Sequence, residues 1–170
     1  TLICGPTAGN EAHPDVTLVS VTTADEMLAA CLEAYHTADA VIMAAAVADF
    51  KPSDTHSRKI KKEKNIDALA LEPTTDILAT LGATKTHQVL VGFALESNNA
   101  IENGQQKLIN KNLDAIVVNS LEDPGAAFGH NTNKISFLQR NKDAVHYPLK
   151  SKSEVAADIL SHLNTMLYDS

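Results

Sequence analysis

Short, unbroken apolar runs separated by helical patterns are the feature that most constrains how this chain folds. The runs are AVIMAAA (residues 40–46), VLVGF (89–93) and LDAIVVN (113–119). A strand buried on both faces gives such a run, whereas a strand that faces water on one side alternates. Strands that alternate with helices are typical of a parallel sheet covered on both faces. The sequence therefore predicts an α/β fold with a Rossmann-like, doubly wound, mostly parallel sheet.

Helix-capping patterns place the elements near the two ends of the chain. A β-branched run predicts a strand over residues 16–21, and Thr23-Ala24-Asp25-Glu26 is a capping box that opens a helix to about His36. A second capping box, Ser151-Lys152-Ser153-Glu154, opens an amphipathic helix to about Tyr168. Its apolar face is expected to contain Val155, Ile159, Leu160, Leu163 and Leu167.

The middle of the chain has weaker patterns. Weak alternation predicts a strand over residues 66–71, and residues 75–81 are expected to form a short helix that ends at Gly82. A helix is expected over residues 98–110, although Gly104 costs about 1 kcal/mol relative to Ala. Residues 135–139 and 144–147 predict a β-hairpin at the edge of the sheet.

The length and the charge of the chain exclude some classes of function. A chain of 170 residues, 44% hydrophobic and 21% charged, is expected to form one globular domain. Its net charge of −7 argues against a surface that coats nucleic acid or an anionic membrane. The longest apolar run, residues 40–48, is far shorter than the roughly 20 residues that a membrane-spanning helix needs. Scattered histidines and two distant cysteines, Cys4 and Cys31, favour neither a zinc site nor a disulfide framework.

The best candidate site follows the first buried run, because ligands of open α/β sheets bind beyond the carboxyl ends of the strands. The segment AAAVADF (44–50) has small residues that let a ligand approach the backbone. Asp49 there can bind ribose hydroxyls or base donors, or hold Mg²⁺ through water. An aspartate that only turns the chain is an equally good interpretation.

Two further groups of side chains suit a phosphorylated ligand. Residues 58–64 carry five positive charges and one negative charge, which attracts a polyphosphate, although a solvated face is the common alternative. Phe93 can stack on a base or belong to the core. Lys107 and Lys111 lie four residues apart on one helix face, where they can bind an anion or complement the helix C-terminus.

The order of the motifs resembles one enzyme family. It is similar to that of phosphopantothenoylcysteine synthetase, also called phosphopantothenate–cysteine ligase, in bacteria often the carboxy-terminal half of a bifunctional coenzyme A biosynthesis protein. The shared motifs are TLICGPT (1–7), AAAVADF, KIKK (59–62), PTTDIL (73–78), VGFALESNN (91–99), QKLINKNLD (106–114), VVN (117–119) and AFGHNTNKI (127–135).

The resemblance implies an amide ligation that depends on a nucleotide. CTP activates 4′-phosphopantothenate to an acyl-cytidylate with loss of pyrophosphate, and the amine of cysteine then displaces CMP. CTP is thus a substrate used with Mg²⁺, and no flavin is expected in this chain. The family also implies a homodimer. The two distant cysteines favour reduced thiols in the cytoplasm, and the net charge and the short apolar runs argue against nucleic acid and membrane as partners.

Site residues carry over from the family position by position. Lys59 matches the residue expected to be catalytic, and no metal ligand is implied. Thr75 stands where the family commonly has proline. The nucleotide-contacting positions are Ala45, Ala46, Asp49, Lys59, Thr74, Thr75, Asp76, Ile77, Phe93, Lys107 and Lys111.

The start of the chain departs from the family pattern. We expect a single ligase domain over residues 1–170 that lacks the family's N-terminal nucleotide-binding βα unit, and such a fragment is expected to bind nucleotide even if it is inactive alone. Two alternatives stay open: a Rossmann-like nucleotide-binding module without ligase activity, and an interaction domain whose lysine-rich segment meets an acidic partner. CTP is favoured over ATP, but both fit the motifs.

Overall fold

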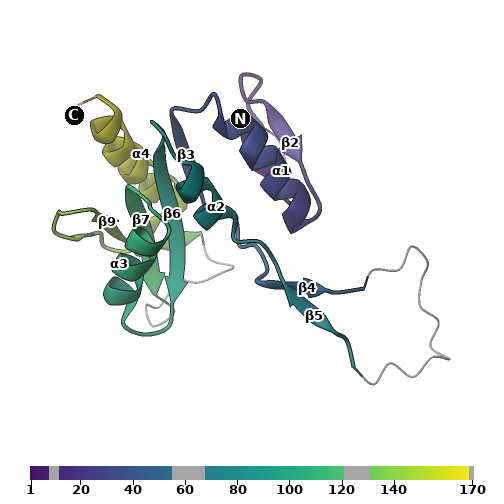
Figure 1. The fold of residues 1–170 in the computed structure, drawn as a ribbon. Helices are drawn as coiled ribbons and strands as arrows, with labels where there is room; N and C mark the ends of the chain where they lie inside the picture. Colours follow the sequence, from purple (N-terminus) through teal and green to yellow (C-terminus); the bar gives the residue numbers. More distant parts are fainter. Residues whose placement is uncertain (8–11, 55–67, 121–130, 169–170) are drawn as a thin grey trace. The chain divides into compact units, whose positions relative to one another are not determined.

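The computed structural model describes residues 1–7, 12–54, 68–120 and 131–168 (Figure 1). The chain divides into two compact units. Unit 1 contains residues 1–33 and 45–77, and unit 2 contains residues 34–44 and 78–170. The expectation of one ligase domain over the whole chain stays a prediction.

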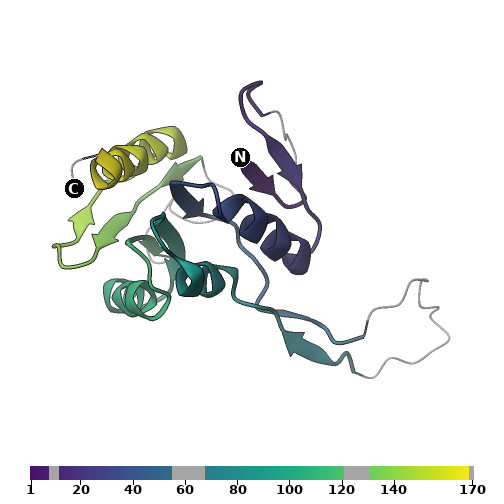
Figure 2. The ribbon, with the colours of Figure 1, turned by 45° about the horizontal axis from the view of Figure 1, so that its top comes forward.

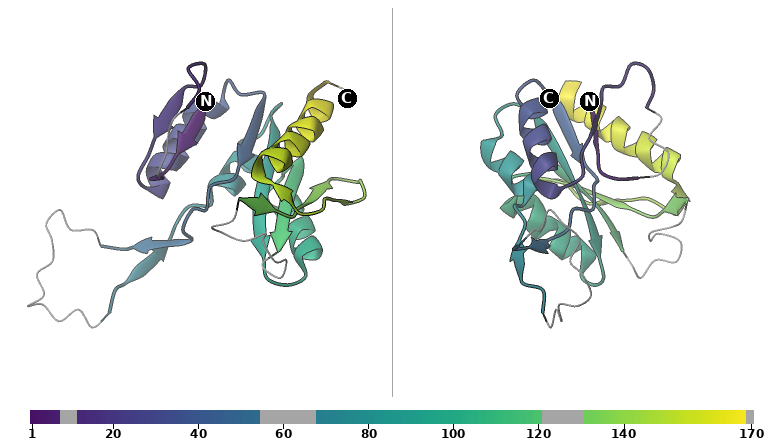
Figure 3. Two further views of the ribbon diagram at one scale, coloured as in Figure 1. Left: turned by 180° about the vertical axis from the view of Figure 1, so that it is seen from behind. Right: turned by 90° about the vertical axis from the view of Figure 1, so that its right-hand side faces the viewer.

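Unit 1 contains two short two-stranded sheets and most of helix α1 (Figure 3). β1 (Leu2–Cys4) and β2 (Leu18–Ser20) run parallel, so the strand predicted over residues 16–21 is confirmed in a shorter form. β4 (Phe50–Pro52) and β5 (Leu71–Pro73) run antiparallel. Of the strand predicted over residues 66–71, residues 66 and 67 lie outside the described residues, residues 68–70 are not in a strand, and Leu71 begins β5. β5 forms where residues 71–73 pair with β4, and the alternation of residues along the sequence does not indicate where this pairing starts.

Helix α1 (Ala24–Tyr35) begins at the predicted capping box. The backbone N–H of Glu26 donates to the Thr23 hydroxyl at 3.1 Å, and the N–H groups of Thr22 and Thr23 donate to the Glu26 carboxylate at 2.6 and 3.1 Å. These backbone hydrogen bonds lower the pKa of Glu26. The capping box thus satisfies N–H groups that a helix start otherwise leaves unpaired.

Unit 2 is built on a five-stranded sheet with the order β10-β9-β7-β6-β3. β3 (Ala40–Met43), β6 (Val89–Glu96) and β7 (Ala115–Ser120) are parallel, as the apolar runs predicted. β9 (Ser136–Gln139) and β10 (Val145–His146) form the predicted antiparallel hairpin at the edge. A further short antiparallel pair joins β8 (Thr132–Asn133) to β11 (Lys150–Ser151).

Helices cover both faces of this sheet, which confirms the doubly wound class. Figure 2 shows α4 (Lys152–Tyr168) on one face and α3 (Ala100–Asn110) on the other. Leu160 of α4 is 55% exposed, so it lies outside the buried stripe expected for this helix. The core between α4 and the sheet consists of Val91, Ala115, Val117, Ile135, Phe137, Val155 and Ile159, of which the last two lie on α4.

Two glycines lie inside helices for reasons of packing. Helix α2 (Ile77–Thr84) continues through Gly82, so the predicted stop at this residue is wrong. A Cβ atom on Gly82 would lie 1.8 Å from the carbonyl oxygen of Lys111. A Cβ atom on Gly104 in α3 would lie 2.6 Å from a methyl carbon of Val118 in β7. Both glycines therefore permit close approach between elements rather than ending a helix.

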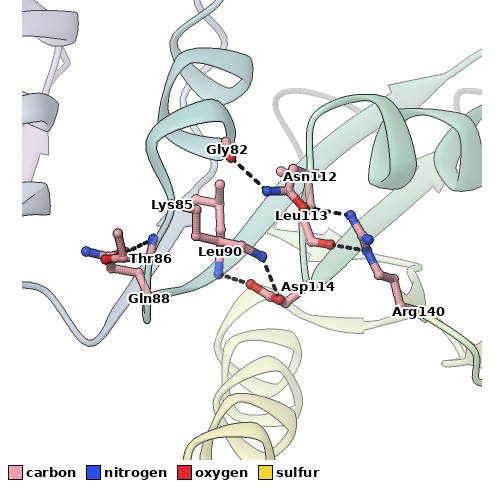
Figure 4. A network of polar contacts seen from close by, with 9 residues as sticks. All are labelled: Gly82, Lys85, Thr86, Gln88, Leu90, Asn112, Leu113, Asp114 and Arg140. Carbon is pink, nitrogen blue, oxygen red and sulfur yellow. Dashed lines mark hydrogen bonds and ion pairs between the residues drawn. The ribbon is translucent and has the colours of Figure 1, made fainter.

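Polar contacts link neighbouring elements at the end of the sheet where β6 and β7 begin (Figure 4). The Asn112 side chain donates to the carbonyl of Gly82 at 2.8 Å, and the Arg140 guanidinium donates to the carbonyl of Leu113 at 3.0 Å. Asn112 has a φ of 52°, in the left-handed region that Asn tolerates better than most residues. These bonds join α2 and the end of β9 to the turn between α3 and β7.

Candidate functional site

A cleft of about 840 Å³ lies within unit 1. It is bordered by residues just beyond the carboxyl ends of β1 and β2, by the start of α1, by residues 45–48 and by the β4–β5 pair. Three of the expected nucleotide-contacting residues line it: Ala45, Ala46 and Thr74. Since ligands of parallel sheets bind beyond the carboxyl ends of strands, this cleft is the candidate site.

Thr74 joins the two motifs that contribute to the cleft. Its backbone N–H donates to the carbonyl of Asp49 at 2.9 Å, and its hydroxyl donates to the carbonyl of Ala48. Residues 45–50 are thereby held against the start of residues 74–77, although 26 positions separate Ala48 from Thr74. The structure thus brings together the AAAVADF and PTTDIL motifs.

The other residues of these two motifs differ in exposure. Thr75 and Asp76 are exposed, whereas Ile77 at the start of α2 is buried. A buried side chain leaves a ligand only backbone atoms to contact at Ile77. Asp49 is exposed and lies next to the cleft in sequence, but its side chain is not among the lining groups.

The cleft contains an ion-pair cluster that the sequence analysis missed. The ammonium of Lys51 lies 2.6 Å from a carboxylate oxygen of Asp25 and 3.6 Å from one of Glu72. The hydrogen bond that the Lys51 ammonium donates to Asp25 is the main cause that raises the pKa of Lys51. All three residues line the cleft. Lys51 could have been suspected from the sequence only because it directly follows the AAAVADF motif. No local pattern relates Lys51 to Asp25 or Glu72.

Unit 2 holds the remaining described site residues on two faces of its sheet. Phe93 in β6 packs against the core beneath α4, on the face opposite to α3. Lys107 lies on α3, and its ammonium is 2.6 Å from a carboxylate oxygen of Glu96. Lys111 is the C-cap residue of α3, where its N–H donates to the carbonyl of Lys107 at 3.0 Å. The two lysines therefore share a helix, and Phe93 lies apart from them.

The expected catalytic residue, Lys59, lies outside the described residues, as does the whole lysine-rich segment 58–64. Its place relative to the cleft therefore stays a prediction from the motif order. Among the described residues, Lys51 is the lysine that lines the cleft of unit 1.

Other features of the described residues limit the kinds of site they can form. Within residues 1–7, 12–54, 68–120 and 131–168, no group of three or more His, Cys, Asp or Glu side chains can hold a metal ion. No helix in this part of the chain has the length and apolar character needed to cross a membrane. Cys31 is buried, and burial raises the pKa of its thiol, as expected for a packing residue.

Comparisons with known proteins agree with this fold. The chain is 37% identical to the coenzyme A biosynthesis bifunctional protein CoaBC of Bacillus subtilis, over 95% of this chain and 40% of that protein. It is 45% identical to a protein from an unknown prokaryotic organism named cysteine/cysteine sulfinic acid decarboxylase, over 99% of this chain and 47% of that protein. The chain thus spans less than half the length of these relatives.

A solved structure covers nearly the whole chain. The crystal structure of the C-terminal domain of CoaBC superposes with a TM-score of 0.80 at 36% identity, over 99% of this chain and 74% of that one. The model of the family described as the DNA/pantothenate metabolism flavoprotein C-terminal domain matches residues 1–167. The chain therefore belongs to the family of DNA/pantothenate metabolism flavoprotein C-terminal domains.

Proposed function

We propose that this chain is the ligase domain of coenzyme A biosynthesis that joins 4′-phosphopantothenate to cysteine with CTP. The observation that carries the proposal is the likeness to the C-terminal domain of CoaBC, at 36% identity over 99% of this chain. The order of motifs also supports it, since eight segments spread over most of the chain resemble those of phosphopantothenate–cysteine ligases.

The cleft of unit 1 supports the binding of a nucleotide. Ala45 and Ala46 present small side chains to the cleft, so a ligand can reach the backbone there. Thr74 anchors the same segment through the carbonyls of Ala48 and Asp49. Within the proposal, Asp49 binds ribose hydroxyls, and residues 74–77 complete the nucleotide contacts with exposed polar groups and backbone.

The reaction has two steps. A carboxylate oxygen of phosphopantothenate attacks the α-phosphorus of CTP, the P–O bond to pyrophosphate breaks, and an acyl-cytidylate forms. The amine of cysteine then attacks the acyl carbon, CMP leaves, and the amine releases a proton. Charge builds up on the phosphate oxygens during the first step, so a cation beside them stabilises that transition state more than the ground state, and the proposal assigns this role to Lys59.

Magnesium enters this reaction as part of the nucleotide substrate. Mg²⁺ is commonly held by one or two carboxylates together with substrate phosphates and water. Within the proposal, the Mg²⁺ ion arrives bound to the phosphates of CTP. No flavin is assigned to the chain, and a homodimer in the cytoplasm completes the proposal.

The test is pyrophosphate release in the presence of Mg²⁺, CTP, phosphopantothenate and cysteine. We expect release only when both CTP and phosphopantothenate are present, and calorimetric binding of CTP in preference to ATP. Lys59→Gln is expected to lower turnover by roughly 100-fold or more, as loss of one transition-state donor does elsewhere. Lys142→Gln, at an exposed lysine in the hairpin turn, is the matched control. Wild-type turnover in Lys59→Gln would refute the catalytic role.

Two other candidates predict different results. A nucleotide-binding module without ligase activity would bind CTP or ATP and release no pyrophosphate. The relative named cysteine/cysteine sulfinic acid decarboxylase, 45% identical, favours a test of a second activity. Carbon dioxide release from cysteine or cysteine sulfinic acid by this chain would support that activity in place of ligation.

A further inference from the structure

A partly buried carboxylate forms an ion pair with one of the lysines expected to contact the nucleotide. Glu96 ends β6, and Lys107 lies on α3, the helix that packs beside β6 and β7 (Figure 1). One carboxylate oxygen of Glu96 lies 2.6 Å from the Lys107 ammonium, and the other accepts a hydrogen bond from the Asn103 side chain at 3.1 Å. Both oxygens of Glu96 are thus engaged by side chains of a single helix.

The helix and the turn before it hold this carboxylate from more than one side. Asn103 and Lys107 lie four residues apart, so they occupy the same face of α3. The Asn103 side chain also donates to the carbonyl of Asn98 at 3.0 Å, which ties the turn between β6 and α3 to the same group. Glu96 therefore sits in a fixed position at the carboxyl end of a parallel strand, where ligands of such sheets bind.

The two partners differ in exposure. The Glu96 side chain is 11% exposed, whereas the Lys107 side chain is 45% exposed. The carboxylate is therefore the inner partner and the ammonium the outer one. An ammonium group has three N–H donors, so a bond to Glu96 leaves others that can reach a phosphate.

We propose that Glu96 is a positioning residue that orients Lys107 toward the phosphates of the nucleotide substrate. The proposal rests on the ligase function proposed above. A free lysine side chain must lose rotamer freedom when it binds a phosphate. Glu96 restricts Lys107 before the nucleotide arrives, so less of this entropy is lost on binding.

The substitution that tests this role is Glu96→Gln, which keeps the size of the side chain. A Gln amide can accept only one of the two hydrogen bonds, because its other terminal atom is a donor. We expect the KM for CTP and the calorimetric Kd for CTP to rise by roughly 3- to 10-fold, the cost of one immobilised side chain, while kcat changes little. Glu102→Gln is the matched control, because Glu102 is exposed in the first turn of the same helix.

A double variant separates positioning from a general structural effect. If Glu96 acts through Lys107, then Glu96→Gln has no further effect on CTP affinity once Lys107→Met is present. A further loss in the double variant would mean that Glu96 acts by another route, which overturns the proposal. Urea denaturation of each variant identifies any general loss of structure.

The outcomes also distinguish this proposal from the function on which it rests. Absence of CTP binding and of pyrophosphate release in the wild-type chain overturns both. Wild-type CTP binding that Glu96→Gln leaves unchanged overturns only the role of Glu96. Tighter CTP binding by Glu96→Gln also overturns it, because the carboxylate would then compete with phosphate for Lys107.

Discussion

The carboxylate of Asp114 lies 2.8 Å from the ammonium of Lys85, 29 positions away in the sequence (Figure 4). Its other oxygen accepts the backbone N–H of Leu90 at 2.7 Å. One side chain thus connects the segment after α2 with the beginnings of β6 and β7. Because Leu90 is fully buried, its N–H has no access to water in place of this partner.

Asp114→Ala is expected to lower the free energy of unfolding by about 2–3 kcal/mol, since hydrogen bonds to charged groups contribute about 1.5–3 kcal/mol. The measurement is urea denaturation at neutral pH. Asp143→Ala is the control, because Asp143 is exposed in the hairpin turn and such changes usually stay within about 0.5 kcal/mol. Equal stability of the two variants would contradict a structural role for Asp114.

Gly104→Ala is expected to destabilise the protein, although Ala is the better helix former by about 1 kcal/mol. The added methyl group would lie 2.6 Å from a methyl carbon of Val118, so either α3 or β7 must shift. Overpacking of this kind costs about 1–3 kcal/mol. The free energy of unfolding measures the net effect. Gly104→Ala should be less harmful in a Val118→Ala background, and a stabilised single variant would show that the helix tolerates the contact.

Thr74→Val is expected to weaken CTP binding by roughly 2- to 12-fold, because it removes a hydrogen bond of about 0.5–1.5 kcal/mol. The lost bond joins the Thr74 hydroxyl to the carbonyl of Ala48 and holds residues 45–48 at the cleft. Calorimetric titration with CTP and Mg²⁺ measures the change. Thr74→Ser retains a hydroxyl and should bind CTP nearly as the wild type does. Weakening in Thr74→Ser as large as that in Thr74→Val would contradict the role of the hydroxyl, because Thr74→Ser keeps the hydroxyl and loses only the methyl group.

The stability of the protein is expected to fall as the pH falls below about 6.5, in part through His162. Its ring stacks on Phe137 with centroids 4.0 Å apart and shares a hydrogen bond of 2.7 Å with the Tyr147 hydroxyl. Burial is the main cause that lowers the pKa of His162; Asp158 opposes this shift, and Lys142 adds to it. A lowered pKa means that the folded state favours the neutral ring, so acid favours unfolding.

Urea denaturation at pH 8 and at pH 5 tests this link. His162→Gln should lose less stability between the two pH values than the wild type does, because the titrating ring is gone. His36→Gln is the control, since His36 is exposed. If the wild type and His162→Gln lost the same free energy of unfolding between pH 8 and pH 5, His162 would not contribute to the pH dependence.

Much of the fold could be predicted because its signals are local. The runs that became β3, β6 and β7 needed only their own apolar residues to be recognised as buried strands. The capping boxes at Thr23 and Ser151 place the starts of α1 and α4, since each is closed by bonds between residues at most four positions apart. The predicted helix stop at Gly82 was wrong, and the packing reasons for Gly82 and Gly104 could not be predicted, because they lie in Lys111 and Val118 outside the two helices.

The candidate site divides in the same way. The motif order indicated the segments at 45–49 and 74–77 and the family to which the chain belongs. No local pattern indicated that Lys51 lies between Asp25 and Glu72, or that Glu96 holds Lys107. The two residues of each ion pair lie on different helices or strands. Contacts between such residues depend on how the helices and strands pack together.

The sequence by itself thus determined the α/β class, the buried strands, the helix starts and the family, because periodicity, capping and motif order are properties of neighbouring residues. Only the tertiary structure decided where β4 pairs with β5, that Phe93 and Lys107 lie on opposite faces of one sheet, and which carboxylates hold Lys51 and Lys107. The physical reason is that register, close approach and ion pairing are set by contacts between distant segments.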